Sequence, residues 1–393
     1  MKSGTALLIL GFLFGVFPSF ACGQGIPSPR GAFAQTWDEA YARMKPLHEE
    51  RQPGADPSTL NGKVICGYQG WFLADGDGAG AGWVHYGPRD FKPGVCTVDL
   101  WPDMSEASPG ESYPTPFHLA DGSAAPLFSS YNAKTVNCHF RWMSDYGIDG
   151  AFLQRFATEL RAPDGYDHLN AILDNVRQGA NANGRTWAVM YDLSGLAKGE
   201  IGSVVIEDWK RLVDRMEVTR DPSYQRQNGK PVVTIWGVGF DEHRKYTLDE
   251  CAQLIEFLKS DPQYGGNCVM LGVPYGWRQQ NRDAVSDPKL HDVILKADIV
   301  SPWTVGRYQT IDRFNNTLDA YPKADLAWCR QNKLDYMPVI FPGFRWHNLM
   351  KYRGKSPPYG DIDRRKGAFF KAQGEGLIAS GVNMLYIAMF DEI

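Results

Sequence analysis

The sequence lacks the short motifs that would assign a reaction at once. It contains no Gly-x-Ser-x-Gly elbow, no P-loop and no His-Glu-x-x-His pair. It therefore gives no sign of an elbow-type serine hydrolase, a P-loop nucleotide-binding protein or a zinc peptidase. The eight histidines are scattered without paired spacing, which leaves metal-dependent hydrolysis as a weak third hypothesis. No cofactor and no metal ligands are predicted.

Excess positive charge and closely spaced cysteines are also missing. The formal net charge is -4, and no concentrated Lys/Arg face is evident, so nucleic acid is excluded as a partner. Six cysteines follow the first two dozen residues at wide spacing without a Cys-x-x-Cys pair. We predict mostly buried thiols rather than a disulfide framework. These cysteines are Cys66, Cys96, Cys138, Cys251, Cys268 and Cys329.

After the apolar run near the N-terminus, no segment of the sequence has the length and apolarity of a transmembrane helix. The apolar run at residues 6–17 is short, follows Lys2 and precedes Ser19-Phe20-Ala21, a pattern typical of a signal peptide cleaved after residue 21. We therefore expect a secreted, periplasmic or cell-surface bacterial protein. Cys22 directly follows and is a candidate for a lipid anchor, although Ser19 and Phe20 fit the usual lipidation signal poorly.

Aromatic side chains are abundant instead. The chain has twelve Trp and eighteen Tyr, whose rings suit the apolar faces of sugars while their polar tips hydrogen-bond hydroxyl groups. A large core built of amphipathic aromatics explains the same composition. Composition alone does not decide between these two interpretations.

The chain is long enough for one large domain. Its 393 residues are 43% hydrophobic and contain no boundary linker, and a single barrel can absorb this length. We predict a signal peptide at 1–21 and an N-terminal segment at 22–60 with a helix near 36–51. The remaining residues, 61–393, form the predicted glycosidase-like barrel.

Short apolar runs alternate with amphipathic helical segments along this domain. Capping signals such as Thr247 with Glu250, and the pair Asp287-Pro288, mark helix starts. Apolar strands alternating with helices predict a parallel sheet closed as a (β/α)8 barrel. An open doubly wound sheet is the alternative, but no Gly-rich phosphate turn follows the first strand. The eight predicted strands are residues 64–67, 150–154, 186–191, 232–236, 268–272, 298–301, 336–341 and 384–390.

More than eighty residues separate the first two strands. The excursion at residues 71–132 is rich in Gly and Pro, and its Gly-rich stretch 76–82 is predicted to be a flexible loop. A loop of this length is more often a binding lid than decoration, although surface decoration remains the alternative. It would bring polar and aromatic side chains to the rim, namely Trp83, His85, Tyr86, Trp101, Asp103 and His118.

Carboxylates and aromatic residues gather where the predicted strands end. A barrel places its chemistry at this end, and paired carboxylates with aromatic platforms are typical of glycoside hydrolysis. Each acid could instead cap a helix or form a structural ion pair. The candidate catalytic residues are Glu392, Asp391, Asp192 and Glu159. The candidate substrate-binding residues are Trp71, Arg155, Trp236, Tyr275, Trp277, Trp303, Arg307, Trp346 and His347.

Three segments resemble a known family. Residues 63–72 (KVICGYQGWF), residues 338–344 (PVIFPGF) and the terminal Phe390-Asp391-Glu392 are similar to a bacterial group of glycoside hydrolase family 99-like proteins, some of them labelled xylosidase or arabinosidase. The resemblance covers nearly the whole chain after the signal. It implies a (β/α)8 barrel and, in the mannosidase branch, a retaining endo-α-mannosidase. The substrate is not carried over, because that branch is distant.

The same resemblance bears on the end of the chain. The family carries Asn-Glu-x-x-Glu-Gly after its eighth strand, and Glu392 matches the first Glu, which in the family deprotonates the sugar 2-hydroxyl. Asp391 replaces the Asn. The second Glu, the family's general acid/base, would fall two positions after Ile393. We therefore expect a chain truncated at its C-terminus, without the final helix of the barrel and without an identified second acid.

The leading hypothesis is an exported glycoside hydrolase acting on a plant or microbial glycan by carboxylate acid/base chemistry, with possible participation of the 2-hydroxyl. A carbohydrate-binding barrel without catalysis is the alternative. The sugar, the linkage and the anomeric outcome stay open.

Overall fold

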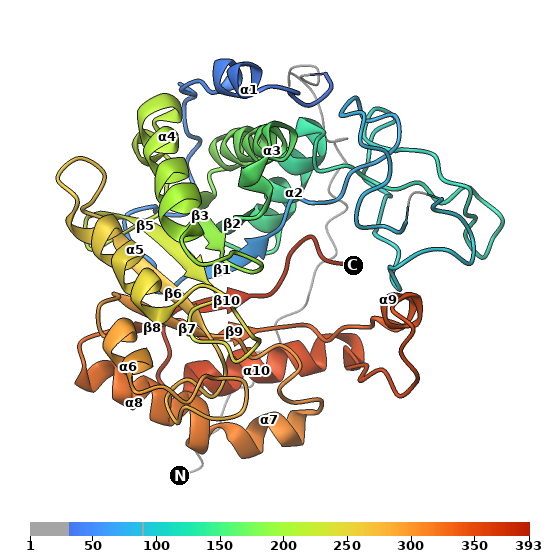
Figure 1. Ribbon diagram of the computed structural model, residues 1–393. Helices are drawn as coiled ribbons and strands as arrows, with labels where there is room; N and C mark the ends of the chain where they lie inside the picture. Colours follow the sequence, from blue (N-terminus) through green and yellow to red (C-terminus); the bar gives the residue numbers. More distant parts are fainter. Residues whose placement is uncertain (1–30, 89) are drawn as a thin grey trace, which may run out of the picture.

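The computed structural model describes residues 31–88 and 90–393, and the predicted signal peptide and Cys22 lie outside them. Strands form a curled sheet with helices around it (Figure 1). The strands are β1 (Val64–Tyr68), β2 (Gly150–Phe156), β3 (Thr186–Asp192), β5 (Lys230–Trp236), β6 (Cys268–Val273), β7 (Ile299–Pro302), β8 (Asp335–Tyr336), β9 (Val339–Ile340) and β10 (Leu385–Ile387). β4 (Arg226–Gln227) pairs antiparallel with β5.

The sheet closes into a barrel through β8 and β9, which are two halves of the seventh barrel strand. Parallel pairing runs in the order β8-β7-β6-β5-β3-β2-β1-β10-β9. Between the halves, Met337 N donates to Val300 O at 2.9 Å and Pro338 O accepts from Tyr386 N at 3.1 Å. Pro338 has no N–H to offer, which accounts for the interruption at this point. The predicted eight-stranded (β/α)8 barrel is confirmed.

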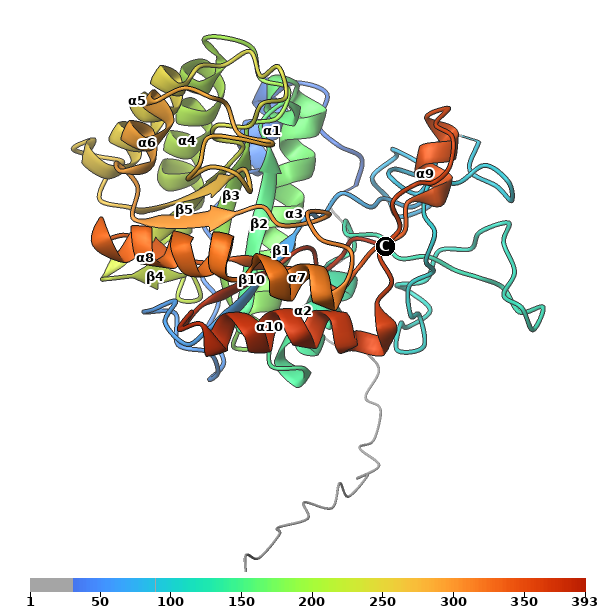
Figure 2. The same cartoon turned by 90° about the horizontal axis from the view of Figure 1, so that it is seen from below.

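Helices cover the outer face of the sheet, as expected for parallel strands (Figures 1 and 2). The expected capping box at Thr247 and Glu250 is present. Among the described residues, those after β10 form no helix. The α-helices are α1 (Trp37–Arg43), α2 (Ala133–Asp145), α3 (Pro163–Ala182), α4 (Glu207–Met216), α5 (Leu248–Ser260), α6 (Lys289–Ile294), α7 (Ile311–Thr317), α8 (Ala324–Gln331), α9 (His347–Tyr352) and α10 (Ala368–Ala379). Short π and 3-10 turns are η1 (Glu159–Arg161), η2 (Ile201–Ile206), η3 (Val218–Arg220), η4 (Asp319–Lys323) and η5 (Arg365–Gly367).

The barrel interior is filled by large side chains. The Tyr386 ring stacks on Phe152 with centroids 5.9 Å apart, and its hydroxyl lies 3.7 Å from the sulfur of Met190. Gly67 makes room for it, since a Cβ there would lie 2.1 Å from the Tyr386 oxygen. The barrel is therefore a packed core whose free space lies at its rim.

The N-terminal helix is shorter than the predicted 36–51 region. A capping box at Thr36 starts α1, and the helix ends at Arg43, two residues before Lys45-Pro46, where the residue preceding proline disfavours helix. Arg43 pairs with Asp167 of α3. The helix therefore packs on the outside of the barrel.

The long excursion after β1 builds a small core of its own. Tyr86, Leu127 and Phe128 are buried together, and Tyr86 donates to Phe128 O at 2.8 Å. In the Gly-rich stretch, Asp77 accepts hydrogen bonds from Ala79 N and from Ser129 Oγ. Tyr86 is thus a core residue of the excursion and does not present its ring at the rim.

The buried-thiol prediction is confirmed for four of the cysteines: Cys66, Cys251, Cys268 and Cys329 are free and buried. Cys96 is a half-buried free thiol.

Candidate active site

Two acids directly follow β10, and the first of them anchors the chain. Asp391 is 3% exposed, and its two carboxylate oxygens accept hydrogen bonds from Gln69 N at 2.8 Å and Gly70 N at 2.7 Å. Burial raises the pKa of Asp391 to about 6, against the lowering effect of these hydrogen bonds. Gly70 has a positive φ of 66°, and a Cβ there would lie 2.3 Å from the Ile172 side chain. Asp391 therefore ties the end of β10 to the end of β1.

Glu392 has a different environment from its neighbour. It is exposed at the barrel mouth, and one of its oxygens accepts a hydrogen bond from Gln69 Nε2 at 3.0 Å. Its carboxyl is recessed among protein atoms, and this desolvation, with the charge of Asp391, raises its pKa to about 7. An accessible carboxyl with a pKa near neutrality can exchange a proton with a ligand.

A second pair of acid and amide lies two strands away. At the end of β3, Asp192 accepts a hydrogen bond from Gln154 Nε2 at 2.6 Å and another from Ser194 N at 2.8 Å. β3, β2, β1 and β10 are neighbours in this order. The mouth of the barrel therefore carries a row of four side chains, Asp192, Gln154, Gln69 and Glu392, in which an acid stands at each end and two amides lie between them. The Tyr386 phenol lies in the barrel core, and burial, followed by the charges of Cys66, Asp391, Glu392 and Asp192, raises its pKa.

Glu159 belongs to a separate cluster. It lies in η1, and its carboxylate is 3.2 Å from Nδ1 of His168. Burial lowers the pKa of His85 to about 4, and the Glu159 charge opposes this shift. Among the described residues, no hydrogen bond or ion pair joins Glu159 to an acid or amide of the row. Glu159 is therefore not part of these hydrogen-bonded pairs.

Trp71 lies at the mouth with both ring faces covered. Its indole stacks on His85 at 4.1 Å and on Phe156 at 5.3 Å, with interplanar angles of 15° and 9°. The ring therefore has no free face for a sugar. Its Nε1 is buried and has no hydrogen-bond partner among the described residues, so a ligand would reach this donor only after the surrounding side chains move.

Trp236 and Trp303 form an aromatic corner at another part of the mouth. Their rings meet edge to face at 5.6 Å, and the Arg244 guanidinium lies 5.4 Å from the Trp236 ring centre. Within the described chain, Nε1 of Trp236 is also buried without a partner. Gly272 gives this ring its space, because a Cβ there would lie 2.5 Å from the indole.

Three predicted substrate-binding residues are packed away from the mouth. Arg155 is 1% exposed and forms a two-pronged ion pair with Asp208 of α4, since Phe152, Gln154 and Phe156 take the inward positions of β2. Trp277 is fully buried against Trp328. Tyr275 is 2% exposed beneath Tyr321, with ring centres 4.3 Å apart. The prediction that these three contact a sugar is not supported by their positions, which are those of core residues.

The remaining predicted residues lie in or beside the loops that follow β7 and β9. Arg307 pairs with Asp283 at 2.7 Å. Trp346 is 38% exposed, and its Nε1 donates to Tyr359 O. His347 starts α9, and its Nδ1 lies 3.7 Å from Asp361.

Sequence reasoning assigned no role to the two amides that hold the acids. Gln69 and Gln154 stand at strand ends, but a search for acids and aromatics passes over them. Their position was the available signal, because the carboxyl ends of neighbouring parallel strands meet at one edge.

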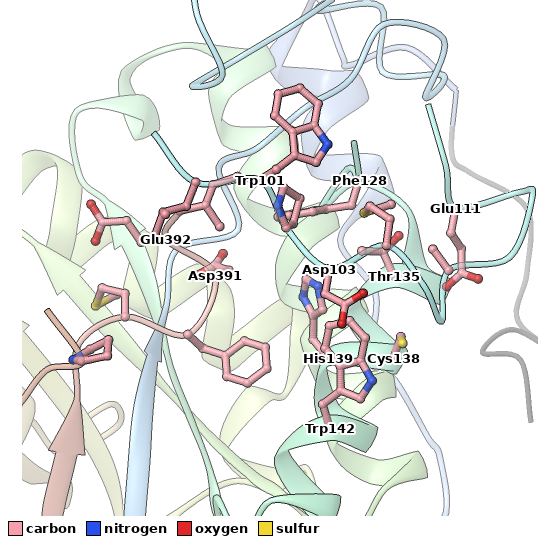
Figure 3. Close-up of a pocket in the computed structure, with 18 of the residues that line it drawn as sticks. Trp101, Asp103, Glu111, Phe128, Thr135, Cys138, His139, Trp142, Asp391 and Glu392 are labelled. Atoms are coloured by element: carbon pink, nitrogen blue, oxygen red, sulfur yellow. The ribbon is translucent and has the colours of Figure 1, made fainter. Parts of the chain in front are cut away.

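A cavity of about 320 Å³ opens beside the two terminal acids. Figure 3 shows Asp391 and Glu392 toward one side and Asp103, His139 and Trp142 toward the other. His139 is 5% exposed and contacts the Tyr68 hydroxyl at 2.8 Å, and burial lowers its pKa to about 3. The cavity thus extends from the mouth along α2. Within residues 31–88 and 90–393, no cluster of three possible metal ligands occurs, and no helix is long and apolar enough to cross a membrane.

Comparison with known proteins identifies the fold. No protein-family profile matches the sequence, and no curated protein matches it. Two structures of the GH99 endo-alpha-mannosidase from Bacteroides thetaiotaomicron, one in complex with BIS-TRIS-Propane, are similar to this chain with a TM-score of 0.56 and 14% identity. The similarity covers 85% of this chain and 85% and 86% of theirs. The chain therefore has a GH99-like barrel fold, as its sequence resemblance implied.

Proposed function

We propose that this protein is an exported glycoside hydrolase of plant or microbial glycans and that Glu392 is its base. The observation that carries the proposal is the placement of Glu392. The residue is exposed at the carboxyl-terminal end of the barrel and lines the cavity there, and its recessed carboxyl is oriented by Gln69 and has a pKa raised to about 7. The GH99-like fold supports the same assignment as an analogy of fold.

Glu392 would withdraw a proton from a sugar hydroxyl, which agrees with the role of the matching residue in the resembling family. Its free oxygen faces no hydrogen-bond donor among the described residues, and a carboxylate with a pKa near 7 combines basicity with ionisation at neutral pH. Asp391 acts as a positioning residue, because its oxygens are occupied by backbone N–H groups.

Asp192 is the candidate second carboxylate, facing the anomeric centre from the other corner of the row. Trp71 and Trp236 would contribute their unpartnered Nε1 donors to sugar hydroxyls once the side chains that bury these atoms have moved. Xylosides and arabinosides are the first substrates to test, because the resembling bacterial group carries those labels. Export through residues 1–21, with a lipid anchor at Cys22, completes the proposal.

The test is Glu392→Gln, measured as release of reducing sugar from plant and microbial glycans. We expect turnover to fall by about a thousandfold while binding, measured by calorimetry, persists. Glu256→Gln is the matched control, because Glu256 is exposed on α5. Unchanged turnover in Glu392→Gln would reject the proposal.

A glycan-binding barrel without catalysis is the second candidate. The observation that favours it is Asp192, whose two oxygens both already accept hydrogen bonds, as in a structural carboxylate. Calorimetric binding of a glycan without any release of reducing sugar would establish this alternative.

A further inference from the structure

The chain is acidic overall, but its positive charge is concentrated in one excursion at the rim. Between β9 and α10, residues 345–366 contain seven Lys and Arg against two Asp, whereas the whole chain carries -4. The expectation that the chain has no concentrated Lys/Arg face is wrong for this segment. We call this segment the basic excursion. Figure 2 shows its helix α9 beside the long excursion that follows β1.

The cations of the basic excursion form no ion pairs with the part of the chain that the structure describes. All seven are exposed: Arg345, Lys351, Arg353, Lys355, Arg364, Arg365 and Lys366. None of them forms an ion pair with another described residue. In contrast, Arg244, Arg278 and Arg307 near the other strand ends pair with Glu242, Asp325 and Asp283. The basic excursion is therefore free to bind an anion.

The excursion is held in place at both of its ends. Phe344 and Ile362 exchange two backbone hydrogen bonds of 3.0 and 2.9 Å. Gly343 permits this approach, because a Cβ there would lie 2.6 Å from Ile362 O. Asn348 N donates to the Asp99 carboxylate and its side chain donates to Val98 O at 2.8 Å. These contacts fix the cations relative to the mouth.

Arg364 connects the basic excursion to the cavity beside Glu392. It lines that cavity together with Asp391 and Glu392, and its guanidinium makes no hydrogen bond to a described residue. Burial alone lowers its pKa. The other charged lining residues, Asp103, Glu111, Asp391 and Glu392, are acids, so Arg364 is the lining cation that would attract a bound anion.

Exposed aromatic rings accompany the charges. Trp346 is 38% exposed and Tyr352 is 61% exposed, whereas the apolar Leu349 and Met350 of α9 are half-buried. Rings beside cations suit sugars that bear anions. Interfacial membrane helices also carry cations and Trp, but they present a continuous apolar face to the lipid, which the half-buried Leu349 and Met350 do not provide.

We propose that the basic excursion binds the anionic groups of an acidic glycan and directs that glycan into the mouth beside Glu392. The proposal rests on the proposed glycosidase function and adds the substrate class, a glycan with uronate carboxylates or sulfate esters. Binding would fall with rising salt, because exposed charges are screened.

The test is native affinity electrophoresis in gels that contain polygalacturonate, dextran sulfate or neutral dextran. We expect the wild type to bind an acidic polymer about tenfold more tightly than dextran at low salt. Retention by polygalacturonate or by dextran sulfate identifies the anionic group as carboxylate or sulfate.

The decisive variant replaces three cations, Lys351→Gln, Arg353→Gln and Lys355→Gln, and should lose about tenfold in affinity for the acidic polymer. The matched control, Lys230→Gln, Lys296→Gln and Lys333→Gln, makes the same charge change at exposed positions near the amino-terminal ends of the strands and should bind as the wild type does. Thermal unfolding confirms that both variants are folded.

Equal affinity for acidic and neutral polymers, or equal binding by the two triple variants, overturns the inference. If a neutral glycan is then cleaved in a Glu392-dependent manner, the proposed glycosidase function stands and only the acidic-glycan inference fails. If no glycan is bound or cleaved, the proposed function and the inference both fail. Binding to anionic phospholipid vesicles that depends on the three cations, without retention by either acidic polymer, would assign the surface to membranes instead.

Discussion

Two corners of the barrel mouth pair an acid with an amide but leave the acid in different states. At the β10–β1 corner, Glu392 is exposed and has one hydrogen bond, from Gln69. At the β3–β2 corner, Asp192 is 6% exposed, and both of its oxygens accept hydrogen bonds. The same pairing of acid and amide thus leaves Glu392 with an oxygen that accepts no hydrogen bond from a described residue, whereas Asp192 is buried and uses both of its oxygens as acceptors. Access and free hydrogen-bonding capacity, rather than the type of residue, distinguish a candidate for chemistry.

The largest expected difference between the corners is in turnover. Asp192→Asn keeps the shape of the side chain and should lower kcat by about ten- to a hundredfold, less than Glu392→Gln, because Asp192 is already engaged with protein donors. Steady-state kinetics on the best substrate measures both. A loss in Asp192→Asn as severe as in Glu392→Gln would show that the two corners contribute equally.

A second test separates Asp391 from Glu392 by its effect on stability. Asp391→Asn loses one acceptor for a backbone N–H and should destabilise the fold by about 1–3 kcal/mol at pH 4. Since the folded-state pKa of Asp391 is raised to about 6, above the value of about 4 in the unfolded chain, ionisation favours the unfolded chain, and the wild type loses stability as pH rises from about 4 to 6. The deficit of the variant should therefore shrink over this range.

Urea unfolding of wild type and Asp391→Asn at pH 4, 5, 6 and 7 measures that trend. A deficit that stays constant or grows with pH would mean that Asp391 is not held at a raised pKa in the folded protein.

A smaller effect is expected at Trp71, on the same side of the mouth as Gln69. Trp71→Phe keeps a ring between His85 and Phe156 but removes the unpartnered Nε1 donor. We expect KM to rise about tenfold with little change in kcat, because one hydrogen bond to substrate is lost. Trp37→Phe is the control, an exposed indole on α1. An unchanged KM would remove Trp71 from the substrate site.

The eight strands could be predicted because each is an apolar run bounded by turns and helix caps. The position of Glu392 after the last strand could be predicted for the same reason. The interruption of the seventh strand at Pro338 is also a local effect of one residue without an N–H.

Other features depend on partners distant in sequence. Arg155 is committed to Asp208, 53 residues away, and Trp71 is covered by His85 from a loop without regular structure. Alternation along β2 nevertheless assigns Arg155 to the outer face once Phe152 and Gln154 are placed inward. The direction in which the Trp277 side chain points could not be predicted from the sequence. Trp277 lies on the loop after β6, where the alternation of side chains along a strand no longer applies.

The central claim is that Glu392 acts as a base with a pKa near 7. The most direct measurement is the pH dependence of kcat/KM for glycan hydrolysis, in the wild type and in Gln69→Leu. The account predicts that kcat/KM rises with pH through an apparent pKa of about 7. Because the Gln69 hydrogen bond lowers the pKa of Glu392, the same limb should move to higher pH in Gln69→Leu. A rate that is flat or falls with pH through this range, or a limb that Gln69→Leu does not move, would contradict it.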